Sequence, residues 1–155
     1  MRRKEKAIRD QSLIESILHK ALVCRIAMCQ DDVPYVVPMS FGYQDNCLYF
    51  HSASEGKKVD VLRNNDRICF EVDVDQQHVD SQIPSECTMR YSSVIGFGRA
   101  VFVTDPAEKR QALDVLMQHY ADSPSEPYEY SDRSLTKVTI IKVEIESMSG
   151  KQSGY

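Results

Sequence analysis

The sequence lacks the long apolar runs and the one-sided charge of proteins that span membranes or bind polyanions. None of its 155 residues lies in a stretch that approaches the roughly 20 apolar residues of a membrane span. The basic start, Met1-Arg2-Arg3-Lys4, is not followed by the apolar segment of a secretion signal. We therefore expect a cytoplasmic protein with no membrane partner. The formal net charge of −4 provides no overall attraction to nucleic acid, so any anion site must be local.

The cysteines match neither a disulfide framework nor a zinc site. They are Cys24, Cys29, Cys47, Cys69 and Cys87. Their number is odd, no pair is spaced Cys-x-x-Cys, and no Cys/His spacing is typical of structural zinc. We expect no disulfide and no metal site, and we expect most of these side chains to be small buried hydrophobic groups.

The motifs of several common enzyme classes are also absent. The sequence contains no Gly-x-Ser-x-Gly, no Walker loop, no Gly-x-Gly-x-x-Gly and no His-Glu-x-x-His. Their absence argues against the common hydrolases, nucleotide triphosphatases, dinucleotide-binding folds and zinc proteases. If the chain is an enzyme, a bound cofactor must supply most of the chemistry.

Short β-like segments dominate what is present. Candidate strands span 23–29, 34–41, 47–51, 67–73, 88–103 and 137–146. Turn residues at 30–32 and 42–46 separate the first three, which predicts a hairpin extended into a three-stranded meander. Gly96 and Gly98 predict that the longest strand either bends strongly or lets another backbone approach closely. A change of apolar phase between Ile140 and Ile141 predicts a bulge in the last strand.

Helices are predicted at the ends of this strand series. Ser12 and Glu15 form a capping box before a first apolar helical face. Asp105 as N-cap and Pro106 at the first helical position begin another helix, which a Pro/Ser-rich loop at 123–127 ends.

Two polar loops complete the pattern. The loop 52–58 leads into a short helix, and the loop 76–86 separates two strands. The sequence thus predicts a mainly β fold, a small closed antiparallel barrel of about six strands with added end helices. One domain is expected over residues 1–149, with a flexible tail at 150–155.

A strand-to-helix junction is the first candidate site. Ser52, Ser54, Gly56, Lys57 and Lys58 bring hydroxyls, ammonium groups and free helix N–H groups together, and this combination suits a phosphate. The plain structural alternative is a capped helix with two solvated lysines.

Two further groups lie near candidate strands. His51 ends the strand before this loop and could titrate near neutral pH in the same pocket, although a lone strand histidine more often packs or lies at the surface. Arg90, Tyr91, Ser92 and Ser93 suit the polar edge of a planar heteroaromatic ligand. The alternative is an ordinary strand with polar residues facing solvent.

A series of short motifs along nearly the whole chain carries a family resemblance. They are Met1-Arg2-Arg3-Lys4, Val23-Cys24-Arg25, Pro34-Tyr35-Val36-Val37-Pro38, Tyr49-Phe50-His51-Ser52-Ala53, Gly56-Lys57-Lys58, Cys69-Phe70-Glu71-Val72-Asp73, the run from Met89 to Gly98, and Asp105-Pro106. In this order they resemble the pyridoxamine 5′-phosphate oxidase-related flavin proteins, and within them the nitroimidazole-resistance (Nim) group. The resemblance implies a split β-barrel homodimer with FMN in two interface sites, and FAD and haem are the less expected cofactors.

The resemblance also implies a role for each candidate residue. Backbone groups of Val37, Pro38, Met39 and Ser40 would line the flavin, His51 and Ser52 would flank the ribityl and phosphate, and Lys57 and Lys58 would neutralise the phosphate. Arg90, Tyr91, Ser92, Ser93 and Val94 would approach the flavin ring from the partner subunit. The chain departs from the family pattern at Cys87, where Trp is frequent, and at Ser92, where a basic residue is frequent.

The implied activity is reduction of a small electron-poor organic substrate, including nitroaromatic compounds. His51 and Arg90 would orient the substrate, and Tyr91 or His51 would donate a proton. The alternative is a flavin or haem carrier or sensor, with His19, His51 or His119 as a haem ligand. Oxidation of pyridoxamine phosphate itself is less expected, because the substrate-binding segment of that enzyme has no counterpart after Ser149.

Overall fold

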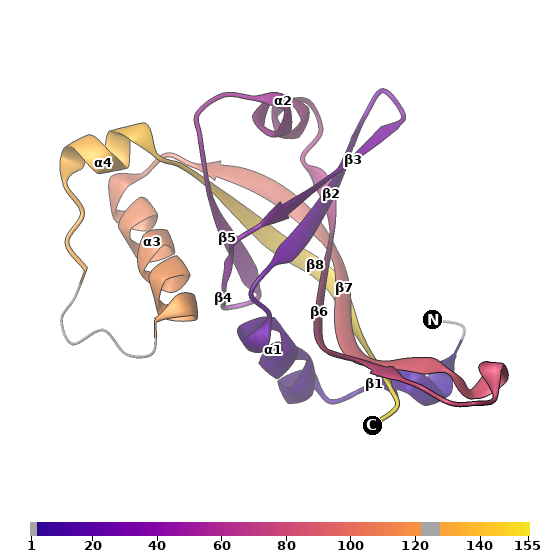
Figure 1. Ribbon diagram of the computed structural model, residues 1–155. Helices are drawn as coiled ribbons and strands as arrows, with labels where there is room; N and C mark the ends of the chain where they lie inside the picture. Colours follow the sequence, from indigo (N-terminus) through magenta and orange to yellow (C-terminus); the bar gives the residue numbers. More distant parts are fainter. Residues whose placement is uncertain (1–2, 122–127) are drawn as a thin grey trace.

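The computed structural model describes residues 3–121 and 128–155 (Figure 1). Its strands are β1 (Ala7–Ile8), β2 (Cys24–Gln30), β3 (Val33–Met39), β4 (Gly42–Gln44), β5 (Cys47–Ser52), β6 (Arg67–Val79), β7 (Thr88–Val103) and β8 (Thr139–Ser153). Its helices are α1 (Gln11–Lys20), α2 (Lys57–Asn64), α3 (Pro106–Tyr120) and α4 (Asp132–Lys137), with short 3-10 helices η1 (Lys4–Lys6) and η2 (Pro84–Glu86). The predicted strands all form, and β1 and β4 raise their number from six to eight.

A single antiparallel sheet contains every strand of the described chain. Its order is β3-β2-β6-β7-β8-β5-β4, and β1 pairs with β8. The terminal strands β3 and β4 do not pair with each other in the described chain, so the prediction of a closed barrel was wrong: the sheet curls but stays open (Figure 1). The mainly β, split-barrel architecture with added helices is confirmed.

Local turn chemistry identified hairpins but not the whole strand order. Asp31 and Asp32 have φ values of 50° and 61°, and Asp45 and Asn46 have values of 51° and 59°. These left-handed conformations suit the two-residue turns of the β2–β3 and β4–β5 hairpins. The predicted three-stranded meander was wrong, because β5 pairs with β8 rather than β3. That pairing joins segments about 90 residues apart, which neighbouring turns cannot specify.

Two apolar clusters lie on opposite faces of β8. The larger cluster fills the inside of the curled sheet and includes Phe41, Phe50, Phe70 and Ile141, and the smaller one joins Ile140 to α3. Both isoleucines are fully buried, so both faces of β8 are covered at this point. This explains the apolar phase change that was predicted to be a bulge.

The bulge lies further along β8. Pairing with β7 stays in register through Ile140 and Ile141, and the shift comes between Phe97 and Gly98, whose partners are Ser147 and Ile145. The predicted close approach at the glycines is confirmed, since a Cβ on Gly96 or Gly98 would lie 2.3 Å from the Phe70 ring or the Glu144 carbonyl oxygen, respectively.

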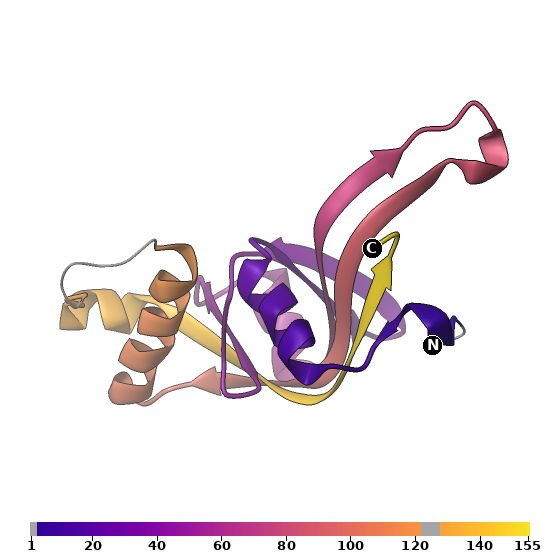
Figure 2. The ribbon, with the colours of Figure 1, turned by 90° about the horizontal axis from the view of Figure 1, so that it is seen from below.

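The strands β6 and β7 form a long hairpin that extends away from the rest of the sheet (Figure 2). Residues 77–79 of β6 pair with 88–90 of β7 beyond the last residue of β7 that pairs with β8, Tyr91. We call residues 77–90 the outer hairpin. Polar residues from 76 onward predicted a loop, but backbone pairing with β7 holds them as a strand without an apolar core.

The helix starts follow capping chemistry with one correction. Asp105 caps α3 through a 2.9 Å bond from the Glu108 N–H, with Pro106 at the first position, as predicted. The cap of α1 is Asp10, whose carboxylate accepts from the Ser12 N–H, so Ser12 was the wrong N-cap. Asp and Ser are comparable caps, and the sequence pattern did not separate them.

The two ends of the described chain meet at one edge of the sheet. β8 continues to Ser153, and Ala7 and Ile8 of β1 pair with Lys151 and Gly150. The predicted flexible tail from residue 150 was therefore wrong over 150–153. Small and polar residues there gave no strand signal, because pairing on two sides holds them rather than apolar burial.

Two predicted features remain to be placed. The Pro/Ser-rich loop at 123–127 lies outside the described residues. Among the described residues, no helix combines the length and apolar character needed to cross a membrane.

Candidate functional site

The start of α2 combines backbone N–H groups with two lysines. Gly56 is its N-cap with φ 120°, and no side chain of the described residues caps the first N–H groups. Lys57 and Lys58 occupy the first two helical positions. Free N–H groups at a helix start attract an anion, and adjacent ammonium groups strengthen that attraction.

Contacts bring this helix start onto β3. The ammonium of Lys58 lies 3.4 Å from Sδ of Met39, and that of Lys57 lies 4.5 Å from the centre of the Tyr35 ring. Lys58 is partly buried, and burial lowers its pKa. No carboxylate of the described chain pairs with Lys58. A thioether is a weak partner for a charge, so a phosphate would balance the Lys58 ammonium better than the Met39 sulfur does.

The predicted backbone donors lie on an edge strand. β3 is terminal in the sheet, so the backbone groups that alternate outward, those of Val36 and Pro38, have no strand partner in the described chain, whereas those of Val37 and Met39 face Ile26 and Cys24 of β2. Met39 is buried, Val37 is partly buried, and Pro38 and Ser40 are exposed. An unpaired strand edge beside the α2 start can hold a ligand by main-chain hydrogen bonds.

His51 and Ser52 end β5, opposite Ile140 and Thr139 of β8. His51 is exposed and Ser52 is partly buried. Four residues separate Ser52 from α2, so both side chains lie at the entrance of the loop that leads to Lys57. Their role at the flank of a phosphate site stays a prediction.

The other predicted site residues lie along β7. Arg90 is exposed and Tyr91 partly buried, whereas Ser92 and Ser93 are buried. Val94 is fully buried in the larger cluster, so its side chain faces the core and cannot meet a surface ligand.

A single chain does not bring the start of α2 together with the predicted site residues of β7. β6 starts at Arg67, three residues after α2 ends, and Gln77, the partner of Arg90, lies ten residues further along. Ten strand residues span roughly 34 Å, whereas α2 is only about 12 Å long. Figure 1 shows α2 and the outer hairpin at opposite ends of the sheet. A single site containing Lys58 and Arg90 would therefore require a second copy of the chain.

Sequence reasoning missed the neighbours of Tyr91. Lys151 donates a short hydrogen bond to the Tyr91 hydroxyl, and Lys6 donates to Ser153, the cross-strand partner of Tyr91. Both lysines lie in segments treated as a terminus or tail. No apolar alternation marks either segment, so only the pairing of β1 with β8 reveals the arrangement.

The remaining candidate histidines have structural contacts. A ring nitrogen of His119, Nε2, lies 2.7 Å from the Ala21 carbonyl oxygen, and the ring lies 4.6 Å from that of Phe41. His19 packs edge-on against Tyr43 at 5.3 Å. No group of three or more potential metal-binding side chains occurs among the described residues. Of the three histidines named for haem, only His51 lies beside the predicted phosphate loop.

Comparison with known proteins identifies the family. The sequence profile of pyridoxamine 5′-phosphate oxidase matches residues 10–152. The chain belongs to this family.

Solved structures with a similar fold match nearly the whole chain. A candidate 5-nitroimidazole antibiotic resistance protein from Bacteroides thetaiotaomicron is 35% identical, with a TM-score of 0.83 over 94% of this chain and 86% of that one. An FAD-binding protein from Mesorhizobium loti is 25% identical, with a TM-score of 0.69 over 96% and 98%. The flavocytochrome Anf3 from Azotobacter vinelandii shares the fold at 21% identity, with a TM-score of 0.86 over 100% and 72%.

A shorter sequence match is to a protein of Rhizobium meliloti. It is 36% identical over 50 residues, which are 32% of this chain and 32% of that protein. The match therefore spans about a third of that relative. The Bacteroides structure matches a larger share of this chain, 94%, than the Rhizobium protein does, 32%, at similar sequence identity.

Proposed function

We propose that the protein is a cytoplasmic homodimeric flavoprotein that binds FMN between its subunits and reduces a small electron-poor organic substrate, nitroaromatic compounds included. The observation that carries the proposal is that Lys58, beside the uncapped start of α2, contacts the Met39 thioether and has no carboxylate partner in the described chain. A flavin phosphate supplies the missing negative charge. The flavin-binding and resistance proteins among the structural neighbours support the same assignment.

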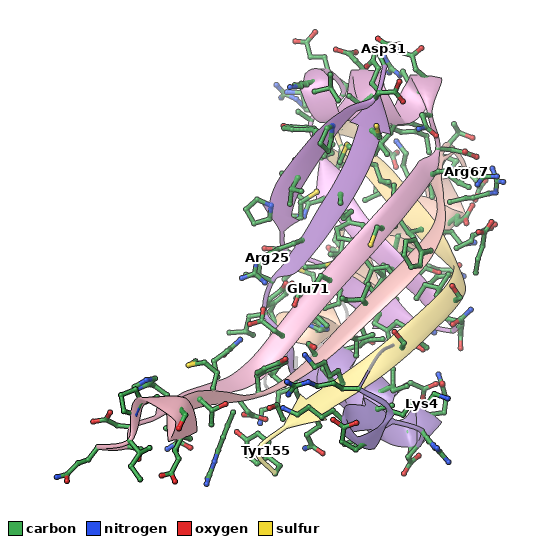
Figure 3. The ribbon with its side chains drawn as sticks, turned by 90° about the vertical axis from the view of Figure 1, so that its right-hand side faces the viewer. Lys4, Arg25, Asp31, Arg67, Glu71 and Tyr155 are labelled. Atoms are coloured by element: carbon green, nitrogen blue, oxygen red, sulfur yellow. The ribbon has the colours of Figure 1, made fainter. Side chains whose placement is uncertain are left out.

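An exposed apolar surface supports the dimer. Val36, Ala27, Cys69 and Phe97 form one cross-strand row over β3, β2, β6 and β7. Val36 and Phe97 are each 55% exposed, and Ile95 beside Phe97 is 44% exposed. We call these five residues the outer face, which Figure 3 views directly. A contiguous exposed apolar surface is typical of a protein interface.

Charged groups border the outer face. Arg25 of β2 contacts Glu71 and Asp73 of β6 at 3.0 and 2.6 Å, and Figure 3 labels Arg25 and Glu71 beside each other. In a symmetric dimer, a second copy on this face would cover its apolar row and bring the partner's outer hairpin toward the α2 start of the first copy. Each site would then draw residues from both chains, as the separation of Lys58 from Arg90 requires.

In this arrangement the chain binds and orients, and the flavin, when bound, supplies electron transfer. Lys57, Lys58 and the α2 N–H groups bind the phosphate, and the edge of β3 provides main-chain groups. His51 lies near the phosphate flank. Tyr91 and Arg90 of the partner approach the ring side, where Arg90 orients substrate and a proton comes from Tyr91 or His51.

A second candidate function is a flavin carrier or sensor without turnover. The same anion site and dimer surface support it, and a flavocytochrome shares the fold. Haem binding has less support in this chain, because His119 and His19 are engaged in packing and only exposed His51 is placed near the loop.

The absorption spectrum of the purified protein tests the proposal. We expect a flavin spectrum, and mass analysis of the cofactor released on denaturation should give FMN. FAD would change the cofactor assignment, a Soret band would favour haem, and a protein that neither retains nor takes up flavin would refute the proposal. Reoxidation of the reduced protein by nitroaromatic compounds distinguishes an enzyme from a carrier.

His51 can be tested separately. The variant His51→Ala should lower turnover with flavin content measured in parallel, and light scattering should give a dimer mass for both proteins. Full flavin content with full turnover would remove His51 from the site, and a monomer mass would contradict an interfacial flavin.

A further inference from the structure

Four of the five partly buried lysines have no carboxylate partner in the described chain, and two of these four have neither a carbonyl partner there nor a place in the proposed phosphate site. The partly buried lysines are Lys6, Lys58, Lys109, Lys142 and Lys151. Lys142 lies 3.4 Å from Glu108, and Lys109 donates to the carbonyl groups of Leu135 and Val138. Lys58 belongs to the phosphate site proposed above. Lys6 and Lys151 remain, and within the described chain their ammonium groups donate hydrogen bonds only to hydroxyl groups.

These two lysines converge on one patch of the sheet. Lys6 donates to Oγ of Ser153 at 2.7 Å, and Lys151 donates to the hydroxyl of Tyr91, with its ammonium 4.9 Å from the ring centre. Ser153 pairs with Tyr91 across β8 and β7, and Ala7 pairs with Lys151 across β1 and β8. We call Lys6, Tyr91, Lys151 and Ser153 the lysine pair site.

The lysine pair site lies on the same side of the sheet as the outer face. Side chains alternate along a strand, so Tyr91 shares its side with Ile95 and Phe97. Lys151 is paired with Ser93, which lies on that side as well. The site therefore continues the surface on which we propose the subunits meet and the flavin ring lies.

The hydrogen bonds of the site leave several donors unused. An ammonium group has three donors and no acceptor, and each lysine uses one donor in the contacts described. Because Tyr91 accepts from Lys151, its own O–H remains free to donate. Neutral hydroxyls do not balance two charges that are partly removed from water, whereas an anion would satisfy both charge and donors.

We propose that the lysine pair site binds the anionic group, a carboxylate or a phosphate, of the small molecule that sits beside the flavin. The placement beside the flavin rests on the proposed function, whereas the anion site rests on Lys6, Tyr91 and Lys151 alone. The proposal defines the ligand class: an electron-poor molecule that carries an acidic group.

Three matched aromatic probes test this selectivity. They are 4-nitrobenzoate, 4-nitrophenyl phosphate and the neutral 4-nitrobenzamide. Their dissociation constants are measured on the flavin-loaded protein from changes in flavin absorption, and on the same protein by saturation-transfer NMR, which requires no flavin. At least one anion should bind about tenfold more tightly than the amide, the scale of one charge-assisted contact. The preferred anion then distinguishes a carboxylate ligand from a phosphate ligand.

Variants test whether the lysine pair site causes the preference for anionic probes. Lys151→Gln and Lys6→Gln should each reduce the preference for the anion several-fold, and Lys151→Arg should retain most of it. Lys142→Gln is a matched control, because Lys142 is also partly buried on β8 but pairs with Glu108. This control should leave the preference unchanged.

Three results would overturn the proposal: equal binding of all probes, an anion preference that survives both glutamine variants, or a loss of dimer in those variants. The last result, measured by sedimentation velocity, would mean that a carboxylate of the second subunit occupies the site. If the protein holds no flavin but NMR still detects the anion preference, the anion site stands and the proposed flavin function fails.

Discussion

The hydroxyl of Tyr120, at the end of α3, lies 2.9 Å from the backbone nitrogen of Phe41 and accepts its hydrogen bond. The same hydroxyl donates to the carbonyl oxygen of Leu22 at 2.8 Å. One side chain therefore ties the segment that follows β3 to the segment that precedes β2. Because Ser40 precedes Phe41, this contact also holds the end of the strand edge proposed to line the flavin.

Removing this hydroxyl should destabilise the protein. Phe41 is fully buried, so in Tyr120→Phe its N–H loses its partner in a place that water reaches poorly. We expect the free energy of unfolding in urea to fall by about 1–3 kcal/mol, the cost of a buried unsatisfied group. The control is Tyr155→Phe, whose hydroxyl bonds to the Asp75 carbonyl from a side chain that is 63% exposed. A fall as large in the control would contradict this explanation.

Gly98, which lies opposite the β8 bulge, should tolerate no side chain. A Cβ on Gly98 would lie 2.3 Å from the backbone oxygen of Glu144, and backbone in a strand paired on two sides cannot move aside easily. Gly98→Ala should lower the unfolding free energy by about 1–3 kcal/mol or more, as overpacking does.

Ser149→Ala on the neighbouring strand is the control for Gly98→Ala, because Ser149 is exposed. Urea unfolding of both variants decides the matter. Equal stability of Gly98→Ala and the parent protein would mean that the strands separate more readily than their pairing indicates.

The sequence predicted those features of the fold that depend on local chemistry. Apolar runs located the strands, with β7 placed at its observed bounds, and Asp105 with Pro106 located the start of α3. Pairing between distant segments was not predictable in this way. The register of β5 against β8 depends on contacts that form only in the folded chain, so the meander and the closed barrel were both wrong.

In the candidate site too, local patterns could be predicted from the sequence, whereas contacts between distant segments could not. Lys57 and Lys58 could be predicted to start a helix because a polar loop before a helix is a local pattern. Lys6 and Lys151 were missed because their importance arises from β1 pairing with β8, and neither segment carries an apolar signal. Whether Arg90 meets Lys58 depends on a second chain, which one sequence read alone cannot position.

Acid should destabilise the protein partly through His119. Burial lowers the pKa of this imidazole from its ordinary value of 6.5, with nearby His19 acting in the same direction and the bond to Ala21 opposing it. The unfolded state therefore binds a proton more readily than the folded state. Stability contributed by neutral His119 is present above the unfolded pKa and is lost as pH falls from about 7.5 toward 5.

The variant His119→Gln tests this pH dependence, since glutamine can still donate to the Ala21 carbonyl but does not titrate. Unfolding free energies from urea titrations at pH 7.5, 6.5 and 5.5 should decline less in the variant than in the parent protein. His78→Gln, on the outer hairpin, is the control and should follow the parent. Parallel decline in all three proteins would assign the acid sensitivity to other groups.

Lys58 offers a test that separates a binding role from a structural one. Its charge is partly buried against Met39 and has no carboxylate partner in the described chain, so it should cost stability when no anion is bound. Lys58→Met should leave the unfolding free energy of the flavin-free protein unchanged or higher. The same variant should bind FMN at least about tenfold more weakly, because a charge-assisted phosphate contact is lost.

Lys109→Met is the control and should behave in the opposite way. Lys109 lies on α3 and donates to the carbonyl groups of Leu135 and Val138 at 3.1 and 2.9 Å. Its removal should lower the free energy of unfolding and leave the FMN affinity unchanged. Fluorescence titration of FMN and urea unfolding measure the two effects independently. A Lys58→Met variant that lost stability but kept its FMN affinity would make this lysine a structural residue and would move the phosphate site away from α2.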